Sequence, residues 1–136
     1  MPHALRPRRL SLTGASHLDL VVDPQRPTRY LVRFCGLNRD RAALAATESA
    51  RVRLMMASLR GEAAFPRPLP ERITIGWLDH TGWHAGRSPL ARALASMECI
   101  RDRMAELDND LMLRVALIAA EREASAERPP DGDDAS

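Results

Sequence analysis

The segment Asp79-His80-Thr81-Gly82-Trp83-His84 combines the residue types in this chain that are best suited to chemistry. A carboxylate and two imidazoles can ligate a metal ion or transfer protons, and here they follow a strand-like run that would aim them from a rigid element. Two histidines four residues apart share one face only in a helix, which Gly82 disfavours. A metal-assisted hydrolase or nuclease around Asp79, His80 and His84 would therefore need a further ligand from elsewhere in the chain. The alternative interpretation is that this segment is a surface loop, which Trp83 anchors to the core.

Other catalytic signatures are missing from the sequence. It contains no P-loop, no GxGxxG, no nucleophile elbow and no HExxH. The two cysteines, Cys35 and Cys99, are isolated within apolar stretches, so we expect buried, reduced thiols. From the sequence we assign no catalytic residue, no metal ligand and no cofactor, and we favour a protein that is not an enzyme.

Arginine is concentrated in the first two thirds of the chain. Residues 1–92 hold 15 Arg against 7 acidic residues, a net charge of +8, whereas residues 93–136 hold 5 Arg against 11, a net of −6. An alternative function, binding of DNA or RNA through phosphates, rests on five closely spaced residues: Arg26, Arg29, Arg33, Arg39 and Arg41. All 20 basic residues are Arg, however, a bias that a GC-rich genome produces without any phosphate binding.

The secondary structure that would position these groups is predicted to start with strands in the N-terminal third of the chain. Residues 9–13, 17–22 and 28–35 alternate with a period of two, and a proline-containing break between the last two predicts a hairpin. Residues 72–78 alternate in the same way and predict a further strand, which a loop over residues 79–87 follows.

Between these strands, residues 39–60 predict a helix with Asn38 as its N-cap and Gly61 beyond its end. The spacing i, i+4, i+7 predicts a buried face flanked by Leu44 and Met55. This expected stripe consists of Ala45, Ser49, Val52, Met56 and Leu59. Three prolines in the next ten residues exclude regular structure there.

A long C-terminal helix is expected to begin at Ser88-Pro89, with Ser as N-cap and Pro at the first helical position. Its apolar residues advance by threes and fours, close to a heptad pattern. The stripe consists of Leu90, Ala93, Met97, Ile100, Met104, Leu107, Leu111, Val115 and Ile118. One continuous helix is the favoured interpretation; the alternative is a break at Asp108-Asn109-Asp110, with Asp110 capping a second helix.

A continuous helix of about 35 residues would span about 50 Å and project beyond a small sheet. Its end would expose an apolar seam consisting of Leu107, Leu111, Val115 and Ile118. Such a seam usually meets a partner, most simply a second copy of the chain, although a helical hairpin within the monomer would also cover it. We therefore favour a non-catalytic adaptor or interaction protein that dimerises or binds a protein partner through this helix.

The length of 136 residues suits one domain over residues 9–125, between a flexible N-terminus (1–8) and a disordered acidic tail (126–136). The expected fold is α+β: a small, mostly antiparallel sheet in β-β-β-α-β-α order, with one packed helix and the long C-terminal helix. No apolar run is long enough to span a membrane, and no signal peptide is recognisable, so we expect a cytoplasmic protein.

This element order is similar to the front half of the ribonuclease H fold. Members of that family bind two Mg²⁺ ions through carboxylates on the first strand, the first helix and the end of the fourth strand. Glu48 and Asp79 fall where two of these carboxylates would lie. Residues 9–13 carry no carboxylate and the back half of the fold is missing, so we do not assign the chain to that family.

Overall fold

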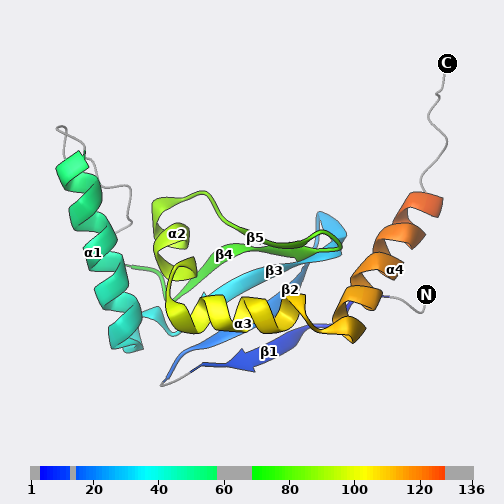
Figure 1. Ribbon diagram of the computed structural model, residues 1–136, viewed down its shortest axis with the longest axis horizontal. Coiled ribbons are helices and arrows are strands. Elements are labelled where there is room, and N and C mark those ends of the chain that lie inside the picture. Colours follow the sequence, from blue (N-terminus) through cyan, green and yellow to red (C-terminus); the bar gives the residue numbers. More distant parts are fainter. Residues whose placement is uncertain (1–3, 13–14, 58–68, 128–136) are drawn as a thin grey trace, which may run out of the picture.

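The computed structural model describes residues 4–12, 15–57 and 69–127. It confirms an α+β fold, in which one open antiparallel sheet of five strands is combined with four α-helices (Figure 1). The strands are β1 (Arg8–Ser11), β2 (His17–Asp23), β3 (Arg26–Cys35), β4 (Arg72–Asp79) and β5 (Gly82–Ala85). The helices are α1 (Arg41–Ala57), α2 (Pro89–Ala95), α3 (Glu98–Asp108) and α4 (Leu111–Glu127), and a short 3₁₀ helix, η1 (Leu37–Arg39), precedes α1.

The strands follow one another across the sheet in chain order, from β1 at one edge to β5 at the other. The predicted hairpin is confirmed: β2 and β3 pair with Leu18 opposite Phe34 and Leu20 opposite Val32, around a turn of Pro24 and Gln25. Because side chains alternate between the faces of a strand, this register buries all four apolar partners on one face.

The predicted loop over residues 79–87 is wrong in part, because residues 82–85 form β5. The chain reverses after Asp79 and Gly82 has φ of +117°, a left-handed conformation that favours glycine. The two expected strands that flank the first helix are otherwise present as β3 and β4, which pair directly with each other.

Helix α1 begins two residues later than expected, and Asp40 rather than Asn38 caps it. The Ala43 amide donates to Asp40 Oδ1 at 3.0 Å, whereas Asn38 lies in η1. The expected helix end near residue 60, together with Leu59 and Gly61, lies outside the described residues.

The predicted buried face of α1 is wrong. Ala45, Ser49, Val52 and Met56 are exposed, and the buried side chains are instead Ala43, Thr47 and Ala50. The helix stands at one end of the sheet and packs on α2 instead of covering a sheet face (Figure 1). Small residues suffice for this contact, and the Thr47 hydroxyl is satisfied by donating to the Ala43 carbonyl at 2.9 Å.

The single continuous helix from residue 90 onward is also wrong. The expected start is present, since Ser88 Oγ accepts a hydrogen bond from the Ala91 amide at 3.1 Å and Pro89 opens α2. Helix α2 ends at Ala95, however, and an extended Met97 precedes α3. A second break falls at Asn109 and Asp110, where the alternative interpretation placed it, and leaves α4 as a long C-terminal helix of 17 residues.

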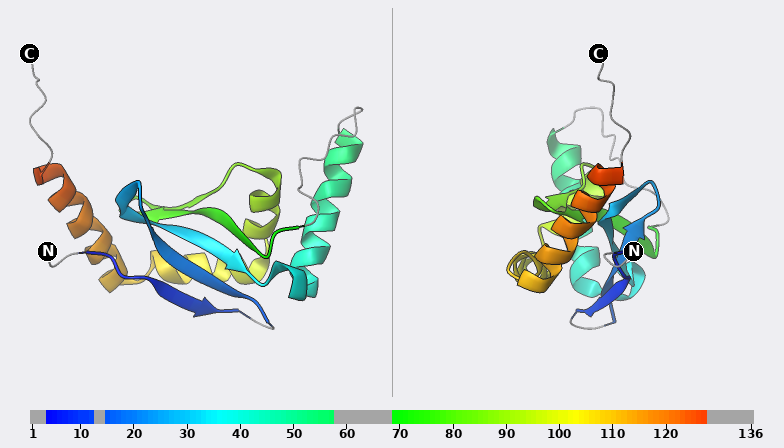
Figure 2. Two further views of the ribbon diagram at one scale, coloured as in Figure 1. Left: turned by 180° about the vertical axis from the view of Figure 1, so that it is seen from behind. Right: turned by 90° about the vertical axis from the view of Figure 1, so that its right-hand side faces the viewer.

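The core lies between the sheet and the helices, because α2, α3 and α4 each contact a strand from the same side (Figure 2). Its largest fully buried side chains include Phe34, Leu18, Leu20, Leu37, Ile75, Leu78, Leu90, Leu94, Ile100 and Leu117. No helix in the described part of the chain covers the opposite face of the sheet, which we call the open face. None of the described helices has both the length and the apolar character that a membrane crossing requires.

A buried ion pair closes the β2–β3 hairpin. Asp23 is only 5% exposed and accepts hydrogen bonds from Arg29 Nε at 2.8 Å and from the Gln25 amide at 2.9 Å. Burial alone would raise the pKa of Asp23, but these bonds and the charge of Arg29 outweigh it and lower the pKa. The pair therefore adds stability above the unfolded-state pKa of about 4, and this stability is lost as the pH falls through the folded-state value.

Replacing Asp23 by asparagine should destabilise the protein by about 1.5–3 kcal/mol at pH 7, because charge-assisted hydrogen bonds are lost. The difference between variant and wild type should shrink below about pH 4, where the wild type also loses the charge. Urea unfolding monitored by circular dichroism between pH 2 and 7 measures both effects. A difference that stays constant over this range would contradict the role of the ionised carboxylate.

Candidate functional site

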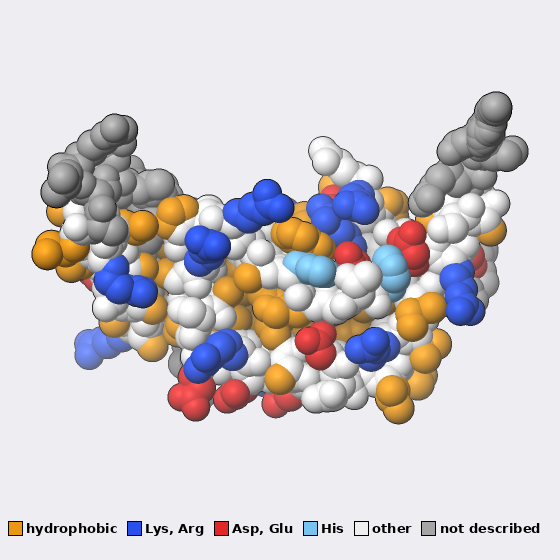
Figure 3. Space-filling model, turned by 45° about the horizontal axis from the view of Figure 1, so that its top comes forward, with side chains coloured by type: hydrophobic (Ala, Val, Ile, Leu, Met, Phe, Trp, Pro, Cys, Tyr) orange, Lys and Arg blue, Asp and Glu red, His pale blue; other side chains and the backbone are white. Residues whose placement is uncertain are grey.

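The described exposed large hydrophobic side chains all lie on two helices. They are Val52, Met55 and Met56 on α1, and Leu111, Met112 and Val115 on α4. These helices stand at opposite ends of the sheet, so hydrophobic side chains gather at both ends of the molecule in Figure 3. The protein therefore exposes two apolar patches to solvent, one on α1 and one on α4.

Helix α4 keeps its apolar surface exposed because a different stripe holds it to the core. Asp110 caps the helix by accepting from the Leu113 amide at 3.1 Å, and Leu113, Leu117 and Ala120 are buried at the spacing i, i+4, i+7. The remaining turns present Leu111, which is 75% exposed, away from the sheet.

The structure separates the predicted seam into two parts. Leu107 is buried in the core on α3, and so does not belong to an exposed surface. Leu111 and Val115 are exposed and Ile118 is half-buried on α4, where Met112, which the sequence interpretation left out, joins them with 80% of its surface exposed. We refer to Leu111, Met112, Val115 and Ile118 as the α4 surface.

The five predicted nucleic-acid-binding arginines do not converge. Arg29 is held by Asp23 and lies over the Trp77 ring at 5.1 Å, and Arg39 pairs with Glu71 at 2.6 Å. Arg26 starts β3 and Arg41 starts α1, so both lie away from the centre of the sheet.

Arg33 is the one of the five that lies at the centre of the open face, opposite Asp19 on β2 and Thr74 on β4. It lines a shallow pocket of about 250 Å³ together with Arg72, Ile73 and Thr74. Neither Arg33 nor Arg72 makes an ion pair within the described parts of the chain.

The Asp79–His84 segment forms a tight hairpin whose polar groups bind one another. Asp79 Oδ1 accepts from the Thr81 amide at 2.9 Å and the Thr81 hydroxyl at 2.6 Å, and His84 Nε2 lies 3.2 Å away. Burial alone would raise the pKa of Asp79, but the bonds from Thr81 and the nearby His84 outweigh it and lower the pKa.

The two histidines of this hairpin separate. The His84 ring stacks on Trp77 with centroids 5.2 Å apart, whereas His80 Nδ1 lies 3.9 Å from Glu121 on α4. Glu48 lies on α1, at the opposite end of the molecule from the β4–β5 turn, and pairs with Arg51 (Figure 1). The structure therefore brings neither the three-residue set nor the Glu48–Asp79 pair together as a metal site.

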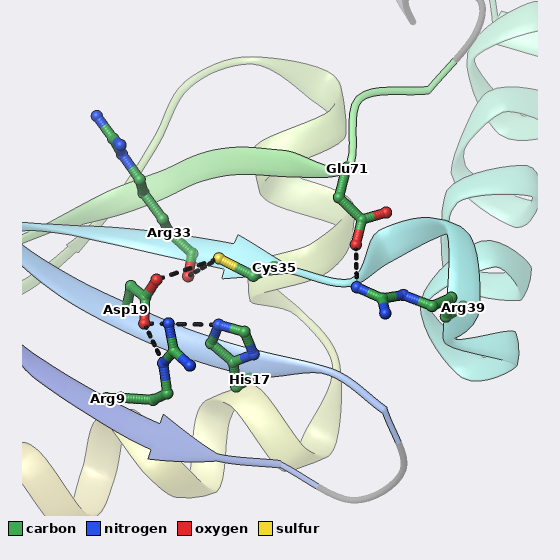
Figure 4. A network of polar contacts seen from close by, with 7 residues as sticks. All are labelled: Arg9, His17, Asp19, Arg33, Cys35, Arg39 and Glu71. Atoms are coloured by element: carbon green, nitrogen blue, oxygen red, sulfur yellow. Dashed lines mark hydrogen bonds and ion pairs between the residues drawn. The ribbon is translucent and has the colours of Figure 1, made fainter.

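A different cluster of ligand-type side chains lies on the open face: His17, Asp19 and Cys35 (Figure 4). His17 and Asp19 are two residues apart on β2 and share one face, and Cys35 of β3 is the direct partner of His17. Asp19 Oδ1 lies 3.5 Å from His17 Nε2, and the Cys35 thiol donates to Asp19 Oδ2 at 3.5 Å. Arg9 Nε on β1 also donates to Asp19 Oδ1, at 2.9 Å.

The charges around this cluster act in opposite directions on its acids. Burial raises the pKa of the Cys35 thiol, and the Asp19 carboxylate adds to the rise. Burial alone would also raise the pKa of Asp19, but the hydrogen bonds from Arg9 and Cys35 and the charges of Arg9 and His17 lower it. A protonated thiol next to a carboxylate is a poor nucleophile, so the arrangement does not suit cysteine catalysis.

Comparison of the chain with protein-family models, with curated proteins and with solved structures found no significant match. The fold and these surfaces define an α+β protein with an open antiparallel sheet and two apolar helices at its ends.

Proposed function

We propose that the protein is a non-catalytic interaction protein that dimerises through the α4 surface. The observation that carries this proposal is that Leu111, Met112 and Val115 are all more than 60% exposed on one helix. Contiguous exposed apolar surface of this kind is typical of an interface. The stripe continues past Ile118 along a shallow groove of about 670 Å³ on the same helix.

A second copy of the chain is the simplest partner for this surface, because a two-fold pair covers the same apolar side chains on both copies. The small side chain at Ala119 allows the two helices to approach closely, and a two-fold axis makes both halves of the contact identical.

Hydrogen–deuterium exchange at low and high protein concentration tests where the copies meet. Peptides from residues 111–127 should exchange more slowly in the concentrated sample, because dimerisation stabilises α4 against local opening. Peptides from residues 41–57, which carry the other apolar helix surface, should exchange equally in both samples. Slower exchange confined to α1 would contradict the proposal.

A second candidate function, binding of nucleic acid through phosphates, is supported by Arg33 and Arg72. Both line the same pocket on the open face, and neither is neutralised by a carboxylate of the described chain. Trp77 lies on the same face but its ring is occupied by Arg29 and His84, so base stacking is not favoured. Contacts of this type would be strong at low salt and independent of sequence.

Replacing Arg33 by glutamate should weaken the binding of a labelled DNA or RNA about tenfold or more at low salt, measured by fluorescence anisotropy. Arg101→Glu is the matched control, because it changes the net charge equally on an exposed position of α3, away from the open face. Equal losses in both variants would show a general charge effect and would remove this candidate.

A further inference from the structure

The cluster of His17, Asp19 and Cys35 has the geometry of a metal site. Zinc binds sulfur at about 2.3 Å, nitrogen at about 2.0–2.1 Å and carboxylate oxygen at about 2.0–2.2 Å, usually as a tetrahedron. These lengths place sulfur and oxygen ligands about 3.5 Å apart, and nitrogen and oxygen ligands about 3.3–3.5 Å apart. Asp19 lies at this spacing from both other ligands through its two oxygens, with Oδ1 3.5 Å from His17 Nε2 and Oδ2 3.5 Å from Cys35 Sγ.

The third side of the triangle, between His17 and Cys35, is no longer than 4.8 Å, because all three ligand atoms lie within this distance of one another. This is the one group of three such residues in the described chain. The backbone fixes the arrangement, since His17 and Cys35 are paired across β2 and β3 and Asp19 follows two residues later on the same face. Metal binding would require rotation of these side chains, so that one Asp19 oxygen approaches both other ligands.

We propose that His17, Asp19 and Cys35 bind one Zn²⁺ ion through an imidazole nitrogen, a carboxylate oxygen and a thiolate. Thiolate and imidazole ligands select zinc and similar transition metals over Mg²⁺ and Ca²⁺, which prefer oxygen. Three protein ligands leave the fourth position of the tetrahedron for water or another small ligand, whereas structural zinc sites are closed by four protein ligands.

Three arginines around the cluster set the charge at this position. Arg9 on β1 binds the Asp19 carboxylate, while Arg33 on β3 and Arg72 on β4 lie on the same face. Arg9 is 68% exposed at its side chain and so can leave Asp19 when the metal arrives. The thiol proton of Cys35 is released to solvent as the metal–sulfur bond forms, so binding strengthens as the pH rises. The surrounding arginines favour an anion at the fourth position.

Titration of the untagged, full-length protein with Co²⁺ tests the proposal. The expected result is one equivalent of Co²⁺ with a near-ultraviolet thiolate-to-metal charge-transfer band and the strong visible bands of tetrahedral cobalt, both lost when Zn²⁺ is added. Cys35→Ser should abolish the charge-transfer band and His17→Ala should weaken binding at least tenfold. Cys99→Ser is the matched control, because that thiol lies on α3, and it should bind as the wild type does.

A wild-type protein without the charge-transfer band, or a band that persists in Cys35→Ser, would overturn the proposal. The Arg9→Gln variant distinguishes loss of a metal ligand from misfolding, because it removes the cation that competes with the metal for Asp19. This variant should bind Zn²⁺ several-fold more tightly, a gain that unfolding cannot produce. Unchanged or weaker binding in Arg9→Gln would contradict the proposed role of the Asp19 carboxylate.

Discussion

Replacing Gly76 by valine should lower the free energy of unfolding by about 3 kcal/mol or more, at the upper end of what overpacking costs. A Cβ atom at this position would lie 2.2 Å from the His84 carbonyl oxygen and 2.5 Å from the Trp83 ring. The carbonyl belongs to the backbone of β5, so it cannot move without breaking the pairing of β4 with β5. Urea unfolding monitored by circular dichroism measures the loss.

Thr74→Val is the control for this substitution, because Thr74 is an exposed residue of the same strand, where valine is well tolerated. It should unfold within about 0.5 kcal/mol of the wild type. If Gly76→Val were as stable as Thr74→Val, Trp83 and β5 could not lie against β4 as the structure places them.

Replacing Leu111 by aspartate should weaken self-association at least about 100-fold. Burial of a leucine contributes about 1.5–3 kcal/mol, a symmetric dimer carries the change twice, and each 1.4 kcal/mol corresponds to a factor of ten. The fold should persist, because residue 111 is the first of α4 and a negative charge there favours a helix.

Met56→Asp is the matched control for Leu111→Asp. Met56 is 79% exposed on α1. Its replacement changes size and charge much as Leu111→Asp does, but on α1 instead of α4. Sedimentation velocity of both variants should show a dimer for Met56→Asp only. Dissociation of Met56→Asp with an intact Leu111→Asp dimer would move the interface to α1.

The fold class and most strands follow from local patterns in the sequence. Strands β2, β3 and β4 alternate over seven or more residues, so period and turn residues predict them well. Strand β5 has only four residues, beginning at Gly82, and these are too few to show a period. Its existence depends on contacts with β4 that no short-range pattern records.

The helices show where local patterns fail. The apolar stripe at Val52 and Met56 resembles a core-facing surface, but Ala43, Thr47 and Ala50 fill the narrow space against α2. Tertiary packing, rather than hydrophobicity, therefore decides which face of α1 is buried. Similarly, the heptad-like spacing from Leu90 to Leu107 continues past the break between α2 and α3, because these two helices bury the same stripe that one long helix would.

The open-face cluster could not be predicted from the hairpin turn. Counting outward from Pro24 and Gln25 would pair His17 with Val32, but an irregularity between Val22 and Asp23 shifts the register by three residues and places His17 opposite Cys35. Cys35 was interpreted as an ordinary buried thiol because its ligand-type neighbours are 16 and 18 residues away in the chain. Residues that only a sheet brings together are invisible to spacing motifs.

Sedimentation equilibrium of the wild-type protein over a wide concentration range tests the proposed dimerisation most directly. One chain has a mass of 15.1 kDa, so we expect the weight-average mass to rise with concentration toward twice this value and to stop there, as a closed two-fold pair requires. A mass that stays at that of one chain at every concentration, or one that rises without limit, would contradict dimerisation through α4.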